Sequence, residues 1–205
     1  ELADLGVQVS MYDQLGSWYS DQPDYSDPEI AKKYLTYDYF LDEVEEVRQK
    51  LGLDNFYLIG QSWGGALTMM YALKYGQHLK GAIISSMVDN IEEYVVNVNK
   101  CREEALPADA VAYMKQKEAE GNWNDPQYQK YVDVLNAGYV DRKQPTSIRH
   151  LINTTATPVY NAFQGDNEFV ITGKLKEWDI RDQIHNIKVP VSYTHLRAHE
   201  TRHDL

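Results

Sequence analysis

The segment Gly60 to Gly65 constrains the fold more than any other part of the sequence. It reads Gly-Gln-Ser-Trp-Gly-Gly and lies between an apolar run, Phe56 to Ile59, and a helical pattern from Ala66 to Tyr75. A strand that turns at once into a helix holds the turning residue at strained dihedral angles, and small flanking residues provide the space for it. The pattern is typical of a nucleophile elbow, in which a serine hydroxyl projects from the turn.

Two residues of this turn are candidates for acyl-transfer chemistry. Ser62 is the candidate nucleophile, and we expect Gly60 and Gly64 to provide the steric room around it. The backbone N–H of Trp63 lies at the positive end of the new helix, so it would face an oxyanion formed when Ser62 attacks a carbonyl group.

Composition excludes several classes of partner. The 205 residues carry a formal net charge of -11, whereas binding to nucleic acid or to an anionic membrane surface requires clustered positive charge. Small-molecule or peptide chemistry is the better interpretation, and no motif calls for a cofactor. Cys101 is the only cysteine, so an intrachain disulfide is impossible, and we expect a reducing, cytoplasmic location.

The first part of the chain predicts alternating strands and helices. Strands are expected at 7–12, 55–59 and 79–85, with helices at 40–51 and 66–75. This β-α-β-α-β order predicts a parallel sheet with right-handed crossovers. The fold class is therefore α/β.

The character of the sequence changes after Met87. From Asp89 to about Gly173 it is polar and rich in tyrosine, with helical patterns at 91–104, 108–120, 126–135 and 148–163. The apolar positions that follow, through Val189-Pro190, indicate a return to the sheet. The predicted domains are a partial core at 1–88, a helical insertion at 89–180, a return to the core at 181–190 and a tail at 191–205.

Four motifs occur in the order found in a known family. They are Tyr12-Asp13-Gln14-Leu15-Gly16, Ser20-Asp21-Gln22-Pro23, the elbow itself, and Gln164-Gly165-Asp166-Asn167-Glu168-Phe169. Together, from about Val7 to Pro190, they resemble the proline iminopeptidases, α/β-hydrolase serine peptidases that release an N-terminal residue, preferably proline, from peptides.

The resemblance implies a partial α/β-hydrolase core with a helical cap formed by the insertion. It implies that Ser62 is the nucleophile and that Glu168 binds the α-amino group of the substrate. An exopeptidase must recognise an ammonium group, and a partly desolvated carboxylate does so through a charge-assisted hydrogen bond. Peptides with N-terminal proline are the expected partners, with no cofactor and no metal.

The two ends of the sequence lack other parts of the family pattern. The triad acid and base belong on loops after later strands, and the His-Gly-Gly-Pro-Gly loop would lie upstream of Glu1. The string from Val191 to Leu205 resembles a translated sequencing adaptor. We therefore expect an internal fragment with a non-native tail, and a chain that is itself inactive.

The histidines of the tail are not interpreted as a metal site. His195, His199 and His203 recur at helical spacing like metal ligands, but the tail has no reason to supply the supporting contacts that a metal site needs. Asp89 follows a predicted strand and is a weak alternative for the triad acid. Two other functions stay open: another capped α/β-hydrolase, such as an esterase or lactonase, and a non-catalytic binding module.

Overall fold

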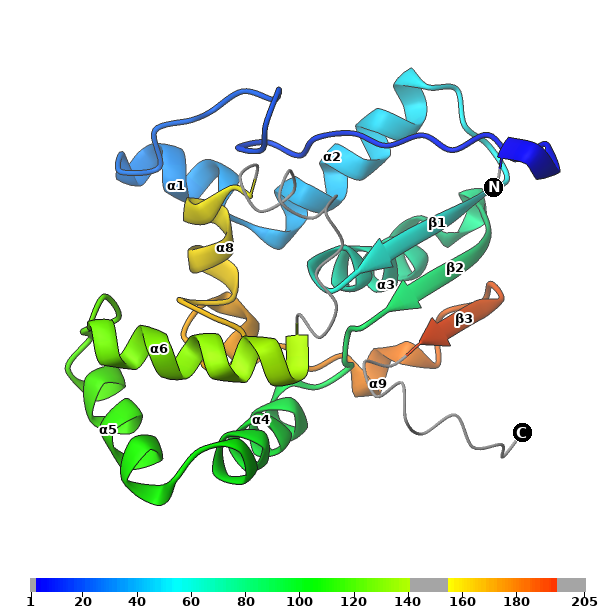
Figure 1. The fold of residues 1–205 in the computed structure, drawn as a ribbon. Coiled ribbons are helices and arrows are strands. Elements are labelled where there is room, and N and C mark those ends of the chain that lie inside the picture. Colours follow the sequence, from blue (N-terminus) through cyan, green and yellow to red (C-terminus); the bar gives the residue numbers. More distant parts are fainter. Residues whose placement is uncertain (1–2, 141–154, 195–205) are drawn as a thin grey trace, which may run out of the picture.

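A computed structural model describes residues 3–140 and 155–194 of the chain. Three strands form a parallel sheet in the order β1-β2-β3 (Figure 1). They are β1 (Phe56–Gln61), β2 (Leu79–Ser85) and β3 (Val191–Thr194). In the described part of the chain the parallel α/β arrangement expected from the sequence is confirmed.

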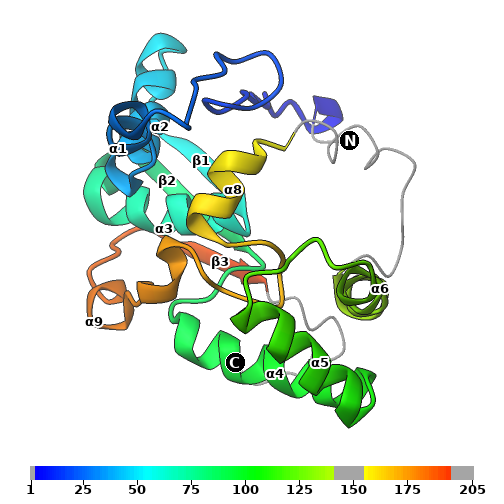
Figure 2. The same cartoon turned by 90° about the vertical axis from the view of Figure 1, so that its left-hand side faces the viewer.

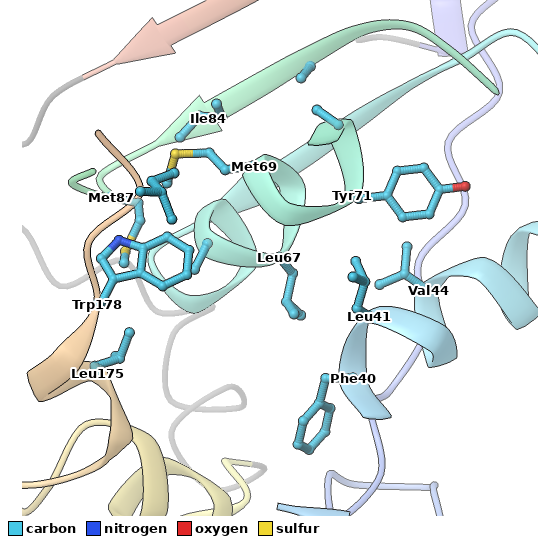
Figure 3. Close-up of a cluster of buried hydrophobic side chains, with 14 of the residues drawn as sticks. Phe40, Leu41, Val44, Leu67, Met69, Tyr71, Ile84, Met87, Leu175 and Trp178 are labelled. Carbon is cyan, nitrogen blue, oxygen red and sulfur yellow. The ribbon is translucent and has the colours of Figure 1, made fainter. Parts of the chain in front are cut away.

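The helix α3 (Trp63–Tyr75) connects β1 to β2 and packs against both strands. It also contacts α2 (Tyr37–Lys50), which buries Phe40, Leu41 and Val44. Figure 3 shows these side chains in one cluster with Ile84 and Met87 from the sheet side. The elbow serine is therefore carried by elements on both sides that are fixed by a common core.

Polar side chains at the N-cap positions define where the first two helices, α1 and α2, begin. Asp27 precedes α1 (Pro28–Tyr34) and accepts a hydrogen bond from the N–H of Glu29 at 2.9 Å. Thr36 precedes α2 and accepts from the N–H of Tyr39 at 3.1 Å. Such N-caps satisfy backbone donors that the first helical turn leaves free.

A second group of helices has a core of its own. It contains α4 (Ile91–Ala105), α5 (Ala108–Ala119) and α6 (Pro126–Leu135), so the predicted helices are confirmed to within one residue. Met114, Tyr128 and Leu135 are fully buried at its centre. Figures 1 and 2 show these helices beyond the strand ends to which the arrowheads point, and α8 (Thr157–Phe163) lies between them and α2.

The remaining elements are short. They are the 3₁₀ turns Ala3–Leu5, Gly76–His78 and Lys174–Glu177, the π turn Asn136–Val140, and α9 (Arg181–Ile184). None of the helices within 3–140 and 155–194 combines the length and the apolar character that crossing a bilayer demands.

The prediction of a strand at 7–12 is wrong. This segment is extended but belongs to no sheet among the described residues, and Val9 and Met11 are 56% and 91% exposed. An alternating pattern becomes a strand only where a neighbouring strand satisfies its backbone groups, and none is paired with it here.

Two other predicted boundaries differ from those in the structure or are only partly covered by it. The helix predicted at 148–163 is present as α8 from Thr157, and its predicted beginning lies outside the described residues. Val191–Thr194, assigned from sequence to the tail, form β3, and Ala82 pairs with Val191 in the register of β2 and β3.

Candidate active site

Ser62 is the turning residue between β1 and α3. Its backbone has φ 51° and ψ -119°, a left-handed conformation that is costly for a residue with a side chain. The Ser62 N–H donates to the carbonyl of Ser85 on β2 at 2.9 Å, and the Ser62 carbonyl accepts from the N–H of Gly65 at 2.7 Å. These bonds hold the strained turn, and the residue itself is exposed to solvent.

The glycines around Ser62 differ in their steric importance. A Cβ on Gly60 would overlap the carbonyl of Gly64, and one on Gly65 would lie 2.7 Å from the Cβ of Met87. A Cβ on Gly64 would meet nothing within 4 Å. The close approaches therefore require Gly60 and Gly65, whereas Gly64, expected to provide room, is not sterically required among the described residues.

Trp63 contributes both its backbone and its ring. As the first residue of α3, it carries one of the N–H groups that have no carbonyl partner within the helix. Its ring packs at a tilt against Phe163 of α8 with centroids 4.4 Å apart, and its indole N–H donates to Oε1 of Gln14 at 3.2 Å. The ring thus joins the elbow to α8 and to the loop that contains Gln14.

Ser62 and Glu168 line the same cavity, which has a volume of about 380 Å³. The two residues come from distant parts of the sequence, the elbow and the loop after α8. Phe40, Trp63 and Phe163 provide aromatic walls. The lining of the cavity is thus largely apolar, and it includes the serine of the elbow and two carboxylate residues, Asp13 and Glu168.

Glu168 is held by two tyrosine hydroxyls. Tyr160 donates to its Oε1 at 2.8 Å, and Tyr94 of α4 donates to its backbone carbonyl at 2.8 Å. Burial raises the pKa of the Glu168 carboxyl above its ordinary value, and the hydrogen bond from Tyr160 partly opposes this rise. Burial and the neighbouring Glu168 also raise the pKa of Tyr160, so its hydroxyl stays protonated and remains a donor.

The loop that contains Gln14 and Leu15 is anchored by a partly buried carboxylate. The N–H of Leu15 donates to Oε1 of Glu43 on α2 at 2.8 Å. Burial raises the pKa of Glu43. Leu15 and its neighbours Tyr12 and Gln14 line the cavity. Glu43 therefore connects this loop to α2, the helix that also carries Phe40.

No histidine is among the described residues that line the cavity. His78 lies in the turn after α3 with its Nδ1 3.6 Å from Oδ1 of Asp54, and His185 is exposed. Asp89, the weak alternative for the triad acid, is not among the lining residues either. The remaining histidines, His150, His195, His199 and His203, lie outside the described residues.

Sequence reasoning missed the residues that support Glu168. Tyr160, Tyr94 and Asn167 are not among the site residues that the sequence indicates. The residue type of Asn167 is a weak local signal, because asparagine side chains often form a turn by accepting from the N–H two residues further along the chain. The tyrosines carry no such local signal, because their contacts depend on how the cap packs.

Comparison with known proteins places this geometry in context. Residues 1–188 match the family model described as the alpha/beta hydrolase fold. The chain is 34% identical to a proline iminopeptidase of Flavobacterium johnsoniae over 193 residues, covering 90% of the chain and 62% of the relative. It is also 34% identical to a proline iminopeptidase of Thermoplasma volcanium over 198 residues, covering 95% of the chain and 64% of the relative.

Solved structures agree with these sequence matches. The crystal structure of VinJ superposes with a TM-score of 0.84 at 26% identity, covering 94% of the chain and 65% of that structure. The proline iminopeptidase of Mycobacterium smegmatis superposes with a TM-score of 0.75 at 26% identity, covering 89% and 60%. The chain spans between 62% and 64% of the length of the curated relatives described here.

Proposed function

The chain belongs to the alpha/beta hydrolase fold family, and on that basis we propose that it carries the nucleophile and the amino-group site of a serine aminopeptidase that releases N-terminal proline from peptides. The observation that carries the proposal is the shared cavity of Ser62 and Glu168. The similarity to proline iminopeptidases supports the choice of substrate. The lone cysteine fits action in the reducing cytoplasm.

In the proposed reaction, the hydroxyl oxygen of Ser62 attacks the carbonyl carbon of the N-terminal residue. The exposed position of Ser62 on its strained turn gives the substrate access to the oxygen. Negative charge then develops on the carbonyl oxygen. The N–H of Trp63, free of an intrahelical partner and at the positive end of α3, stabilises that charge.

Glu168 selects substrates with a free amino terminus. One of its carboxylate oxygens accepts from Tyr160, and a carboxylate has further lone pairs with which to accept from an ammonium. The ammonium of an N-terminal proline has two N–H donors and an apolar ring. A cavity in which the Glu168 carboxylate is accompanied by aromatic walls provides for both, and the charge-assisted hydrogen bond gains strength from partial desolvation.

The complete reaction also needs a base for the Ser62 proton and an acid that orients that base. No histidine that could act as this base is among the described residues that line the cavity. The proposal therefore assigns to this chain three parts of the machinery: the nucleophile, one oxyanion donor and the amino-group site.

The test uses a protein in which the chain is extended to the full length of its relatives. We call it the extended protein. It should release p-nitroaniline from L-proline p-nitroanilide and leave N-acetyl-L-proline p-nitroanilide largely intact, and Ser62→Ala should abolish turnover. Comparable hydrolysis of the two substrates would contradict an amino-terminal specificity. Turnover that survives Ser62→Ala would contradict the assigned nucleophile.

A further inference from the structure

We propose that Asn167 is a positioning residue for Glu168, and that it acts as the last member of a buried hydrogen-bond chain through the cap. The inference rests on the proposed function, because it concerns how the amino-group site keeps its shape. Asn167 is 7% exposed and does not itself line the cavity.

Asn167 fixes the backbone on both sides of Glu168. Its Oδ1 accepts from the N–H of Phe169 at 2.9 Å, closing a local turn around the glutamate. Its Nδ2 donates to Oδ2 of Asp166 at 3.0 Å and to the hydroxyl of Tyr128 at 2.9 Å. The side-chain amide thus uses both its carbonyl and its amino group, as buried amides generally do.

Tyr128 links this turn to the centre of the cap. It lies on α6, is fully buried, and accepts from Asn167 while its own hydroxyl donates to Oε1 of Glu118 at 3.4 Å. Burial raises the pKa of Tyr128, so the hydroxyl keeps its proton and can serve both partners.

The chain of hydrogen bonds ends at a partly buried ion pair. Nη2 of Arg102 on α4 lies 2.6 Å from Oε1 of Glu118 on α5, and the side chains are 2% and 15% exposed. Each of the helices α4, α5 and α6 therefore contributes one member: Arg102 from α4, Glu118 from α5 and Tyr128 from α6. Such a network is geometrically demanding, since leaving one buried member without its partner costs more than the bond itself contributes.

The consequence is that packing of the three cap helices sets the position of the Glu168 backbone. Tyr94, also on α4, adds a second attachment through the Glu168 carbonyl. The carboxylate must lie within hydrogen-bond reach of the substrate ammonium, and displacement of its backbone by about 1 Å is enough to weaken such recognition severely. Asn167 thus contributes to substrate recognition without touching the substrate.

The experiment measures ligand discrimination in the chain of 205 residues. Isothermal titration calorimetry gives the dissociation constants of L-prolinamide and of N-acetyl-L-prolinamide, and their ratio reports recognition of the free amine. We expect Glu168→Gln to lower this ratio about tenfold, and Asn167→Ala and Tyr128→Phe to lower it severalfold, as for loss of a charge-assisted bond or of its alignment. Asn161→Ala, at an exposed asparagine on α8, is the matched control and should leave the ratio unchanged.

The outcomes separate this inference from the proposed function. If Glu168→Gln lowers the ratio while Asn167→Ala and Tyr128→Phe leave it intact, the positioning role is wrong and the function stands. If the unmodified chain shows no preference for the free amine, or Glu168→Gln has no effect, the amino-group site is wrong and the inference falls with it. Tyr128→Phe keeps the buried ring, so it decides the question if Asn167→Ala fails to fold.

Discussion

The hydroxyl of Tyr160 donates to Oε1 of Glu168 at 2.8 Å, and both side chains face the cavity that Ser62 opens into. Tyr160, in the middle of α8, therefore orients the carboxylate that is proposed to bind the substrate. Gln14, which lines the same cavity, accepts a hydrogen bond from Trp63, so the elbow and the amino-group site are connected through the walls of one cavity.

Replacement of this tyrosine tests the orientation of the carboxylate. Tyr160→Phe keeps the ring and removes the hydrogen bond, so Glu168 loses both its alignment and a partner. We expect KM for L-proline p-nitroanilide in the extended protein to rise about tenfold, the magnitude typical of a hydrogen bond to a charged group. Tyr57→Phe, at a tyrosine that is 62% exposed on β1, is the control and should leave KM unchanged. A KM unaffected by Tyr160→Phe would contradict the orienting role.

The dependence of binding on pH follows from the environment of Glu168. Burial raises the pKa of its carboxyl above the ordinary 4.5, and an ammonium is bound only by the ionised form. Affinity for L-prolinamide should therefore fall as the pH is lowered through this raised pKa, with a midpoint above 4.5. The hydrogen bond from Tyr160 lowers the pKa, so Tyr160→Phe should move the midpoint upward.

The check is a series of calorimetric titrations at decreasing pH, with N-acetyl-L-prolinamide as the ligand that lacks the charge. Glu168→Gln should show weak binding without this transition. A transition of the same midpoint in Glu168→Gln would assign it to another group.

Two adjacent glycines provide a matched pair for the elbow. A Cβ at Gly65 would lie 2.7 Å from the Cβ of Met87, so Gly65→Ala should destabilise the fold by about 1–3 kcal/mol, as overpacking does. A Cβ at Gly64 meets nothing within 4 Å, and Gly64→Ala in the first turn of α3 should be neutral or slightly stabilising. Urea unfolding of both variants measures the difference. Equal losses of unfolding free energy would show that the packing around Gly65 is not as tight as described.

The chain of 205 residues should have no detectable peptidase activity. None of its described lining residues is a histidine, and removal of the catalytic histidine alone lowers turnover by a factor on the order of 10⁶ in a serine protease. The assay is release of p-nitroaniline from L-proline p-nitroanilide by the purified chain. Turnover that disappears in Ser62→Ala would show that a base reaches Ser62 within this chain.

Much of the fold could be predicted because its signals are local. The elbow is encoded by glycines and a serine in six consecutive residues. The helices of the insertion are encoded by periodic apolar positions, with N-cap residues such as Asn90 and Asp125. The fold class and the similarity to the proline iminopeptidases both followed from such segments, and the family match confirms the fold.

What could not be predicted depends on contacts between distant segments. The alternation of Val7 to Tyr12 resembles a strand, but strand formation depends on a neighbour that a local pattern does not contain. The steric need for Gly65 rather than Gly64 depends on where Met87 packs. The hydrogen-bond network between Arg102 and Asn167 likewise joins four segments, and no single segment indicates that the members of the network meet.

The most direct test of the account compares two reactions of the extended protein before and after Glu168→Gln. If Glu168 binds the substrate ammonium, kcat/KM for L-proline p-nitroanilide should fall by a factor on the order of 10², the loss expected when a desolvated charge loses its partner. Hydrolysis of p-nitrophenyl acetate, which has no amino group, should stay within about twofold because Ser62 and its turn are unchanged. Equal losses in the two reactions would contradict the account, since Glu168 would then act on the chemistry or the fold rather than on recognition of the amino terminus.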